Sequence, residues 1–316
     1  MNDIMGLRDL NIGNYFKSED NDSDKNNISN DNKNVNMKYL KLNNGEKMPA
    51  LSFGVYEVDI KKTKDVVLDA LDVGYRSIDN AQVYYNEKEV GDAIKESEIP
   101  REEIFLTTKN WVSNAGYDKT MKAFNKSLEN LQTDYLDLFL IHEPFGDYYG
   151  SYRAMQELQK EGKVISIGVS NFNSARLTDL VMNSDVVPQV NQIETTPYFQ
   201  QYETHKHMKE LDILHQAWGP LSEGLDNLFK NPILVEIAEK YSKSTPQIIL
   251  RWIIDRDIGG ICRSMKKERM IQNIDIFDFE LTNKEIEKIK EIDRNKSPFI
   301  DFDDPETVKE FNEEIV

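Results

Sequence analysis

Short apolar runs that alternate with helix-period segments constrain the fold of this chain more than any other feature. In the segment Thr63–Val73, for example, apolar side chains recur at the spacing of one helix face. Runs of four to eight apolar residues separated by such segments imply parallel strands joined by helices. Eight strands are expected: Leu51–Val55, Tyr75–Ile78, Glu103–Thr108, Leu136–Ile141, Val164–Val169, Val187–Asn191, Ile213–Ala217 and Ile258–Ile261.

Helical patterns fill most of the intervals between these runs. Tyr117–Leu131 and Tyr152–Glu161 show the same periodicity, and Asn173–Met182 opens with Asn173 and Ser174, both good N-cap residues. Eight such units in about 280 residues match a (β/α)8 TIM barrel better than a doubly wound sheet. Because no G-x-G-x-x-G motif follows the first run, a Rossmann dinucleotide-binding domain is also disfavoured.

Features outside the repeating units complete the predicted architecture. Met37–Leu42 and Lys47–Met48 flank Asn43-Asn44-Gly45, and Asn-Gly suits the turn of an N-terminal β-hairpin. Leu281–Ile292 predicts a C-terminal extra helix, and Ser297–Val316, which includes Phe311, is an acidic tail. Residues 37–316 are therefore expected to form one barrel domain.

The first 36 residues differ from the rest in composition. Met1–Asn36 contains ten Asn and seven Asp or Glu, with few large apolar side chains. Such a segment buries too little apolar surface to offset the loss of chain entropy, so we expect residues 1–36 to be a disordered extension. A partner-binding tail is the alternative reading.

Net charge and cysteine content exclude several classes of function. The chain carries 39 Lys and Arg against 56 Asp and Glu, a formal charge of −17, and no basic stripe offsets it. We therefore expect no nucleic-acid partner and no membrane partner. Cys262 is the only cysteine, which excludes an internal disulfide. No apolar run reaches the ~18 residues of a spanning helix, and the first ten residues lack a signal-peptide core. A cytoplasmic protein is expected.

Three consecutive predicted strands end in residues that suit acid–base chemistry. In a (β/α)8 barrel the carboxyl ends of the strands carry the active site. Asp79, Lys109 and His142 close the second, third and fourth runs, and Tyr84 follows in the next loop. A buried Lys beside a Tyr should favour the phenolate and lower the Tyr pKa, an Asp should hold the Lys, and a His should bind a substrate oxygen.

The motifs around these residues resemble those of the aldo-keto reductases, over about residues 37–316. The detailed pattern, including Ile141–Gly150 and Ala217–Pro220, is similar to that of bacterial diketogluconate, glyoxal and methylglyoxal reductases. The segments that carry the resemblance are Gly74–Ala81 followed by Tyr84, Asn86 and Glu87; Phe105–Lys109 followed by Trp111; Asp137–Pro144; Gly162-Lys163 with Ile167–Phe172; Pro188–Glu194; and Ala217–Leu221.

The resemblance implies a catalytic tetrad of Asp79, Tyr84, Lys109 and His142, with Tyr84 as general acid. It also implies NADPH/NADP+ as cofactor, with hydride passing from the nicotinamide to a carbonyl carbon. Substrate contacts would come from Tyr56, Trp111 and His142, and no metal is expected. The implied cofactor-binding residues are Gly54, Val55, Tyr56, Ser170, Asn171, Gln192, Trp218, Gly219, Leu221, Arg263, Ser264, Arg269 and Asn273.

The sequence departs from the family pattern near the predicted site. Asn80 replaces the usual Thr, Tyr85 a common Gly, Glu143 a Trp or Gln, and Cys262-Arg263 the usual Pro-Lys. All four tetrad positions are kept. Tyr85 and Glu143 should narrow or polarise the substrate site. Arg263 keeps a positive charge but presents a planar fork in place of a point charge.

The favoured function is NADPH-dependent reduction of small aldehydes, ketoaldehydes or keto sugars to alcohols. The alternative is an NADPH-binding module or redox-sensing partner subunit with little turnover, which the intact tetrad disfavours. Reduction of a conjugated C=C bond is a third reading; in this family it accompanies Glu in place of the His, so His142 disfavours it. The expected partner is a small carbonyl compound, and the expected assembly is a monomer or weak homo-oligomer.

Overall fold

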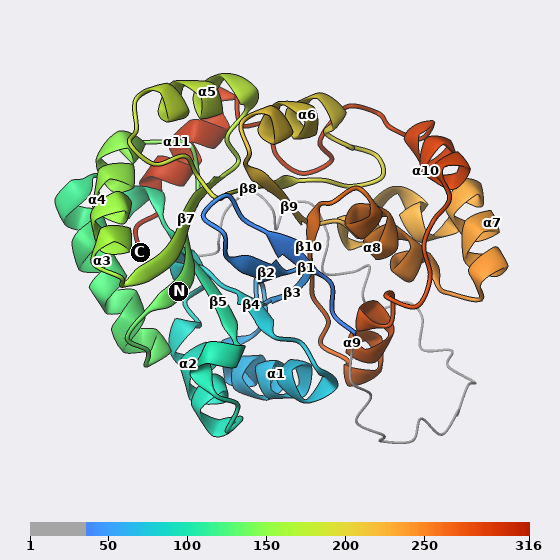
Figure 1. Cartoon of the computed structure of the whole chain (residues 1–316), viewed down its shortest axis with the longest axis horizontal. Coiled ribbons are helices and arrows are strands. Elements are labelled where there is room, and N and C mark those ends of the chain that lie inside the picture. The colour runs from blue at the N-terminus through green and yellow to red at the C-terminus, as the bar shows by residue number, and fades with distance from the viewer. Residues whose placement is uncertain (1–35) are drawn as a thin grey trace.

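Eight parallel strands close into a barrel in the computed structural model, which describes residues 36–316 (Figure 1). Every strand expected from the sequence is present, with ends shifted by up to three residues. The TIM-barrel prediction is thereby confirmed. In barrel order the strands are β3 (Leu51–Gly54), β4 (Ser77–Asp79), β5 (Phe105–Asn110), β6 (Leu136–Ile141), β7 (Val164–Ser170), β8 (Val190–Glu194), β9 (Leu214–Trp218) and β10 (Gly259–Cys262), which pairs with β3.

Helices surround this barrel and connect its strands (Figure 1). The predicted helix Tyr117–Leu131 is observed with the same bounds, and two helices in succession join β9 to β10. The connecting helices are α1 (Ile60–Val73), α2 (Glu87–Glu96), α3 (Tyr117–Leu131), α4 (Tyr148–Lys160), α5 (Ser174–Met182), α6 (Tyr202–Glu210), α7 (Pro232–Tyr241) and α8 (Thr245–Asp255), and α9 (Lys267–Ile274), α10 (Asn283–Lys290) and α11 (Pro305–Glu313) follow β10.

Local signals explain where these elements begin and pack. The Asp59 side chain accepts a hydrogen bond from the Lys61 amide and caps α1, and Gly74 ends that helix at φ 116°, a conformation that favours glycine. Inside β7, a Cβ on Gly168 would lie 2.4 Å from the Val190 carbonyl oxygen. Glycine therefore allows the close approach of β7 and β8.

The N-terminal hairpin covers the end of the barrel at which the strands begin. It consists of β1 (Tyr39–Lys41) and β2 (Lys47–Pro49), as predicted, and lies over the barrel centre in Figure 1. Its buried side chains Leu42 and Met48 pack with Leu138 and Leu140 from β6. This end of the barrel interior is thus filled by apolar side chains.

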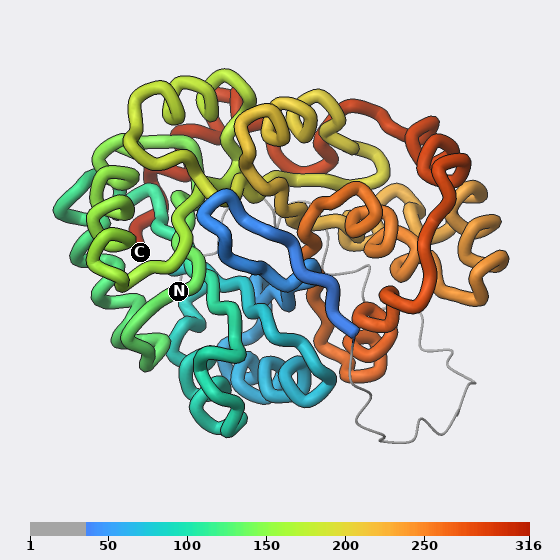
Figure 2. The backbone as a smooth tube through the Cα atoms, in the orientation of Figure 1, coloured from blue at the N-terminus to red at the C-terminus, as the bar shows by residue number. Residues whose placement is uncertain are grey.

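The C-terminal segment was predicted to be a helix followed by an acidic tail, and the structure adds a second helix within that tail. The predicted helix Leu281–Ile292 is α10, but residues 305–313 of the tail form α11. Asp304 caps this helix by accepting from the Glu306 amide, and Pro305 opens it. The chain leaves α10 and reaches the opposite side of the ring (Figure 2), where α11 packs on the short turn η4 (Val112–Asn114).

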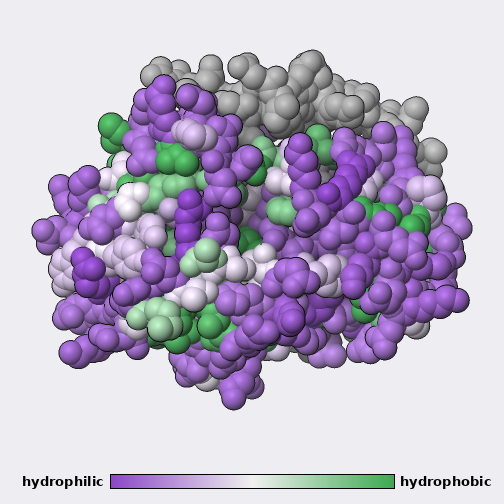
Figure 3. Space-filling view, turned by 90° about the horizontal axis from the view of Figure 1, so that it is seen from above, coloured by the Kyte–Doolittle hydropathy of each residue, from purple (hydrophilic) through white to green (hydrophobic). Residues whose placement is uncertain are grey.

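The exterior matches the acidic composition of the chain. Figure 3 shows a face dominated by hydrophilic residues, with apolar ones in scattered patches. Within residues 36–316, no helix combines the length and apolarity needed to cross a membrane. The predicted disorder of residues 1–36 falls, except for Asn36, outside the described residues.

Candidate active site

The predicted tetrad comes together at the carboxyl end of the barrel. Lys109 Nζ on β5 lies 2.6 Å from Asp79 Oδ1 on β4 and donates to the Tyr84 hydroxyl at 3.3 Å. The Tyr84 and His142 rings meet edge to face with centroids 5.7 Å apart. Lys109 is fully buried and Asp79 is 4% exposed. A charged pair this deep is stable only with good geometry and further hydrogen bonds.

A layer of polar side chains beneath the tetrad supplies those hydrogen bonds. Gln192 Nε2 donates to Asp79 Oδ2 at 2.8 Å and to Gln216 Oε1 at 2.9 Å. Gln216 in turn donates to Ser52, which shares a hydrogen bond with Ser77. The sequence reasoning identified Gln192 but missed Gln216, Ser52 and Ser77. Ser77 was detectable, because alternate strand residues share a face and Ser77 lies two before Asp79.

The pKa of Tyr84 is raised well above its usual value, which is opposite to the sequence-based expectation. Burial is the largest cause, and the carboxyl groups of Asp79 and Glu143 add to it. Lys109 does not reverse the direction, because Asp79 already compensates its charge at 2.6 Å. Tyr84 therefore holds its proton at neutral pH, as a general acid must before it donates.

His142 is neutral, and its surroundings favour one tautomer. Burial, followed by the charge of Lys109, lowers its pKa well below 6.5. Its Nδ1 is buried and has no hydrogen-bond partner among the described residues. An unpaired N–H there would cost more than an unpaired lone pair, so the proton belongs on Nε2. Nε2–H can then donate to a substrate oxygen.

The residues expected to hold a carboxamide lie at the ends of β7, β8 and β9. Ser170 Oγ donates to the Gln192 carbonyl at 2.9 Å, and Trp218 Nε1 donates to Asn171 Oδ1 at 2.7 Å. The Gln192 side chain uses both amide protons, but its oxygen Oε1 accepts no hydrogen bond from the described residues. This oxygen therefore remains as an acceptor for an amide N–H, and the Trp218 ring is half-buried.

Cations expected to bind an adenosine phosphate surround the start of α9. Arg263 donates to the Tyr56 carbonyl at 2.6 Å and pairs with Glu57 at 3.4 Å. Arg269 is exposed and has no ion pair within residues 36–316. Ser264 Oγ accepts from the Lys266 amide at 3.0 Å. In an acidic protein, these cations and the first-turn amides suit a phosphate.

The remaining predicted cofactor residues border the same end of the barrel. Gly54 ends β3 and Val55 follows it, the Tyr56 ring lies 5.1 Å from the Tyr84 ring, and Gly219 and Leu221 follow β9. Asn273 on α9 is buried and hydrogen-bonds Cys262. The free Gln192 side-chain oxygen, the Trp218 ring and the cationic start of α9 fit a phosphorylated dinucleotide.

Sequence reasoning missed an aromatic cover that the C-terminal segment builds beside the tetrad. The Trp111 ring lies 5.1 Å from His142 and 5.6 Å from Phe311 of α11, and Phe145 stacks on Phe311 at 5.9 Å. Trp111 Nε1 also donates to the Glu314 carbonyl at 2.9 Å. Trp111 thus connects His142 of the predicted tetrad to the C-terminal helix α11. The apolar residues Val308 and Phe311, spaced i and i+3, were the sequence feature that indicates a helix here.

Three residues that depart from the family pattern make defined contacts in the structure. Tyr85 donates to Glu314 Oε1 at 2.9 Å and so ties the C-terminal segment to the tetrad loop. The Asn80 carbonyl accepts from Lys109 Nζ at 2.9 Å, a backbone contact that does not depend on the side chain. Cys262 is buried and lies 3.3 Å from the Tyr75 hydroxyl.

The fourth residue that departs from the family pattern, Glu143, lies within the site itself. Its side chain is 6% exposed, and Oε2 accepts from Asn171 Nδ2 at 2.9 Å. Burial raises the pKa of this carboxyl to about 8, against the opposing effects of Asn171 and Lys109. A titratable group therefore lies between the tetrad and the residues expected to hold the carboxamide.

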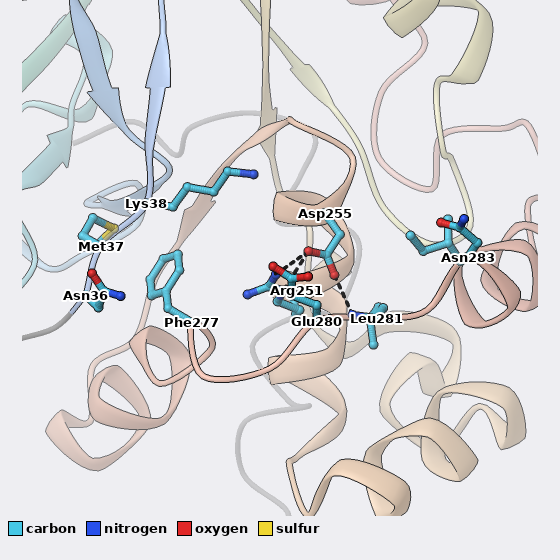
Figure 4. Close-up of a pocket in the computed structure, with 10 residues that line it drawn as sticks. Asn36, Met37, Lys38, Arg251, Asp255, Phe277, Glu280, Leu281 and Asn283 are labelled. Atoms are coloured by element: carbon cyan, nitrogen blue, oxygen red, sulfur yellow. Dashed lines mark hydrogen bonds and ion pairs between the residues drawn. The ribbon is translucent and has the colours of Figure 1, made fainter.

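A separate cavity of about 470 Å³ lies at the opposite end of the barrel. It lies beside the hairpin, where Lys38 and Phe277 line it with Arg251 and Asp255 (Figure 4). Arg251 is paired with Asp255 at 2.6 Å. None of the four predicted tetrad residues lines this cavity.

Comparison with known proteins identifies the family to which the chain belongs. The model of the "Aldo/keto reductase family" matches residues 50–294. The glyoxal reductase of Bacillus subtilis (strain 168) is 44% identical over 259 residues, covering 81% of this chain and 93% of the relative. Methylglyoxal reductase DkgA of Escherichia coli (strain K12) is 38% identical over 265 residues, covering 83% and 96%.

Solved structures agree in fold. An aldo-keto reductase from a Medee basin deep-sea metagenome library superposes with a TM-score of 0.82 at 44% identity, covering 84% of this chain and 98% of that one. An aldo-keto reductase of Bombyx mori in complex with NADP has a TM-score of 0.79 at 36% identity, covering 83% and 94%.

Proposed function

The chain belongs to the aldo/keto reductase family of oxidoreductases, and on this premise we propose that it reduces small aldehydes, ketoaldehydes or keto sugars to alcohols with NADPH. The observation that carries the proposal is the hydrogen-bonded, buried arrangement of Asp79, Lys109 and Tyr84 beside His142. The names of the glyoxal and methylglyoxal reductases support the substrate class, and the NADP complex of the Bombyx mori enzyme supports the cofactor.

Each tetrad member has a distinct task in this proposal. His142 Nε2–H and the Tyr84 hydroxyl together orient the carbonyl oxygen and stabilise negative charge on it. Tyr84 then donates its proton to that oxygen. Lys109, 3.3 Å from the hydroxyl, stabilises the phenolate that remains, and Asp79 holds Lys109 in place.

Binding of NADPH at the ends of β7–β10 would supply the hydride. Ser170, Asn171 and Gln192 would hold its carboxamide, Trp218 would pack on the ring, and Arg269 with Ser264 would bind the adenosine phosphate. Tyr56 and Trp111 would flank the substrate, since their rings lie beside Tyr84 and His142. The aromatic cover excludes water from the reacting atoms.

The test is NADPH consumption across a panel of small carbonyl compounds that includes methylglyoxal and a keto sugar. The proposal expects turnover of at least one member, with a matching alcohol product. Measurable NADPH binding without turnover on any of them would favour the binding-module alternative. An α,β-unsaturated ketone in the same panel distinguishes C=O from C=C reduction by its product.

A further inference from the structure

Glu143 brings a buried carboxyl group to the catalytic end of the barrel, directly after His142. It hydrogen-bonds Asn171 on one side and interacts electrostatically with Tyr84 and Lys109 on the other. We propose that Glu143 is a specificity-determining residue that makes the enzyme discriminate against carbonyl substrates carrying a carboxylate, in favour of neutral ones. This inference rests on the proposed carbonyl reductase function and narrows its substrate class.

The described cations near the site already pair with carboxylates of the protein. The carboxylate of a substrate, lying beside Glu143, would therefore find little positive charge to compensate its own. Lys109 pairs with Asp79 at 2.6 Å, Arg263 with Glu57 at 3.4 Å, and Arg176, whose guanidinium lies 5.9 Å from the Phe145 ring, with Asp303 at 3.5 Å. The carboxyl of Glu143 has one hydrogen-bond partner among the described residues, the Asn171 amide. An anionic substrate would therefore meet a like charge, and the described cations named above are already paired with carboxylates.

The discrimination should depend on pH because burial raises the pKa of Glu143 to about 8. The carboxyl is largely protonated at about pH 6 and ionised at about pH 9.5. Of the groups facing it, Tyr84 has a pKa raised well above the usual range and His142 one lowered well below it, so neither changes charge in this window. Burial lowers the pKa of Lys109 while Asp79 opposes the shift. Lys109 is the same in the wild type and in Glu143→Gln, so the difference between these two proteins reports on Glu143.

The expected loss of kcat/KM for an anionic substrate follows from the repulsion between two like charges. At about 7 Å and an effective dielectric constant of about 20, the repulsion corresponds to roughly a tenfold to fiftyfold loss in kcat/KM. A carboxylate held closer than this would lose more, and one at the rim would lose less because solvent screens it.

The experiment measures kcat/KM with NADPH for succinic semialdehyde and for its methyl ester, a pair that differs in charge. The ester-to-acid ratio cancels any effect on cofactor binding or hydride transfer. In the wild type the ratio should rise at least about tenfold from about pH 6 to about pH 9.5. In Glu143→Gln, where the side chain can still accept from Asn171, it should be low and independent of pH. Equal ratios in the two proteins at both pH values would overturn the proposal.

Glu314→Gln is the matched control. Its carboxylate lies close by, accepting from Tyr85 at 2.9 Å, but it is only half-buried. This variant should keep the wild-type pH dependence of the ratio. An equal loss of discrimination in Glu314→Gln would assign the effect to the general negative field and overturn the role of Glu143.

A binding measurement makes the result independent of turnover. Butyrate and butanamide are titrated calorimetrically into the complex of the enzyme with NADP+. The wild type should bind butyrate progressively more weakly than butanamide as pH rises, and Glu143→Gln should not. If neither the methyl ester nor methylglyoxal is reduced, the proposed function fails, and this titration still decides the charge preference of Glu143.

Discussion

The two ends of the barrel are built from the same strands but have opposite chemical character. On β5 the inward residues run from Phe105, which packs with the hairpin, to Lys109, which pairs with Asp79. On β6 they run from Leu138 to His142, one residue past the strand end. Burial of apolar side chains at one end stabilises the fold, whereas desolvation of the buried ion pair at the other end lowers the net stability. Stability and chemistry are therefore separable by position along each strand.

Replacing Lys109 should produce the largest effect at the polar end. Lys109→Met leaves Asp79 as an uncompensated buried charge and removes the cation beside Tyr84, so kcat/KM should fall by about 10³-fold or more. Stability should fall by about 3–5 kcal/mol. Urea unfolding and steady-state kinetics measure the two losses.

The double variant Lys109→Met/Asp79→Asn sharpens this result. With both charges removed, much of the stability should return while activity stays lost. Recovery of activity together with stability would show that the pair is structural only.

At the apolar end the expectation is reversed. Met48→Ala removes a fully buried side chain of the hairpin and should lower the free energy of unfolding by about 2–5 kcal/mol. The kcat/KM of the folded protein should change less than about twofold, because Met48 contacts none of the tetrad. Met48→Leu, which conserves volume, should cost less than about 1.5 kcal/mol. A large loss of kcat in the folded Met48→Ala variant would contradict the separation of the two ends.

A smaller effect is expected at the rim of the polar end. Arg269→Ala should weaken NADPH binding by about tenfold and leave NADH binding nearly unchanged, since a charge-assisted hydrogen bond contributes about 1.5–3 kcal/mol. Lys267→Ala is the control, because Lys267 already pairs with Asp69 and Asp72. Fluorescence titration with each cofactor is the measurement. Equal weakening for both cofactors would assign Arg269 a structural role, and a wild-type preference for NADH would remove the phosphate role.

The sequence predicted what depends on local pattern. Strand order, the hairpin at Asn43–Gly45 and the bounds of α3 follow from periodicity and turn residues. The tetrad followed from strand ends, since the barrel brings the carboxyl ends of β4, β5 and β6 together. The alternation of inward and outward side chains along the strands also predicts polar residues beneath the tetrad, such as Ser77.

What the sequence could not predict depends on contacts between distant segments. Helix α11 is stabilised through Phe311 by Trp111 and Phe145, which lie more than 160 residues earlier in the chain. The raised pKa of Tyr84 depends first on how deeply its hydroxyl is buried, and then on the carboxyl groups of Asp79 and Glu143. Residue types at strand ends identify the participants, but only distances decide which charge dominates.

In the proposed mechanism Tyr84 is the general acid, held in place by the other polar groups at this end of the barrel. The decisive measurement is single-turnover oxidation of enzyme-bound NADPH with methylglyoxal in Tyr84→Phe. We expect a rate about 10²–10⁴-fold below that of the wild type, with NADPH affinity changed less than about threefold. A variant that keeps more than about a tenth of the wild-type rate would contradict it.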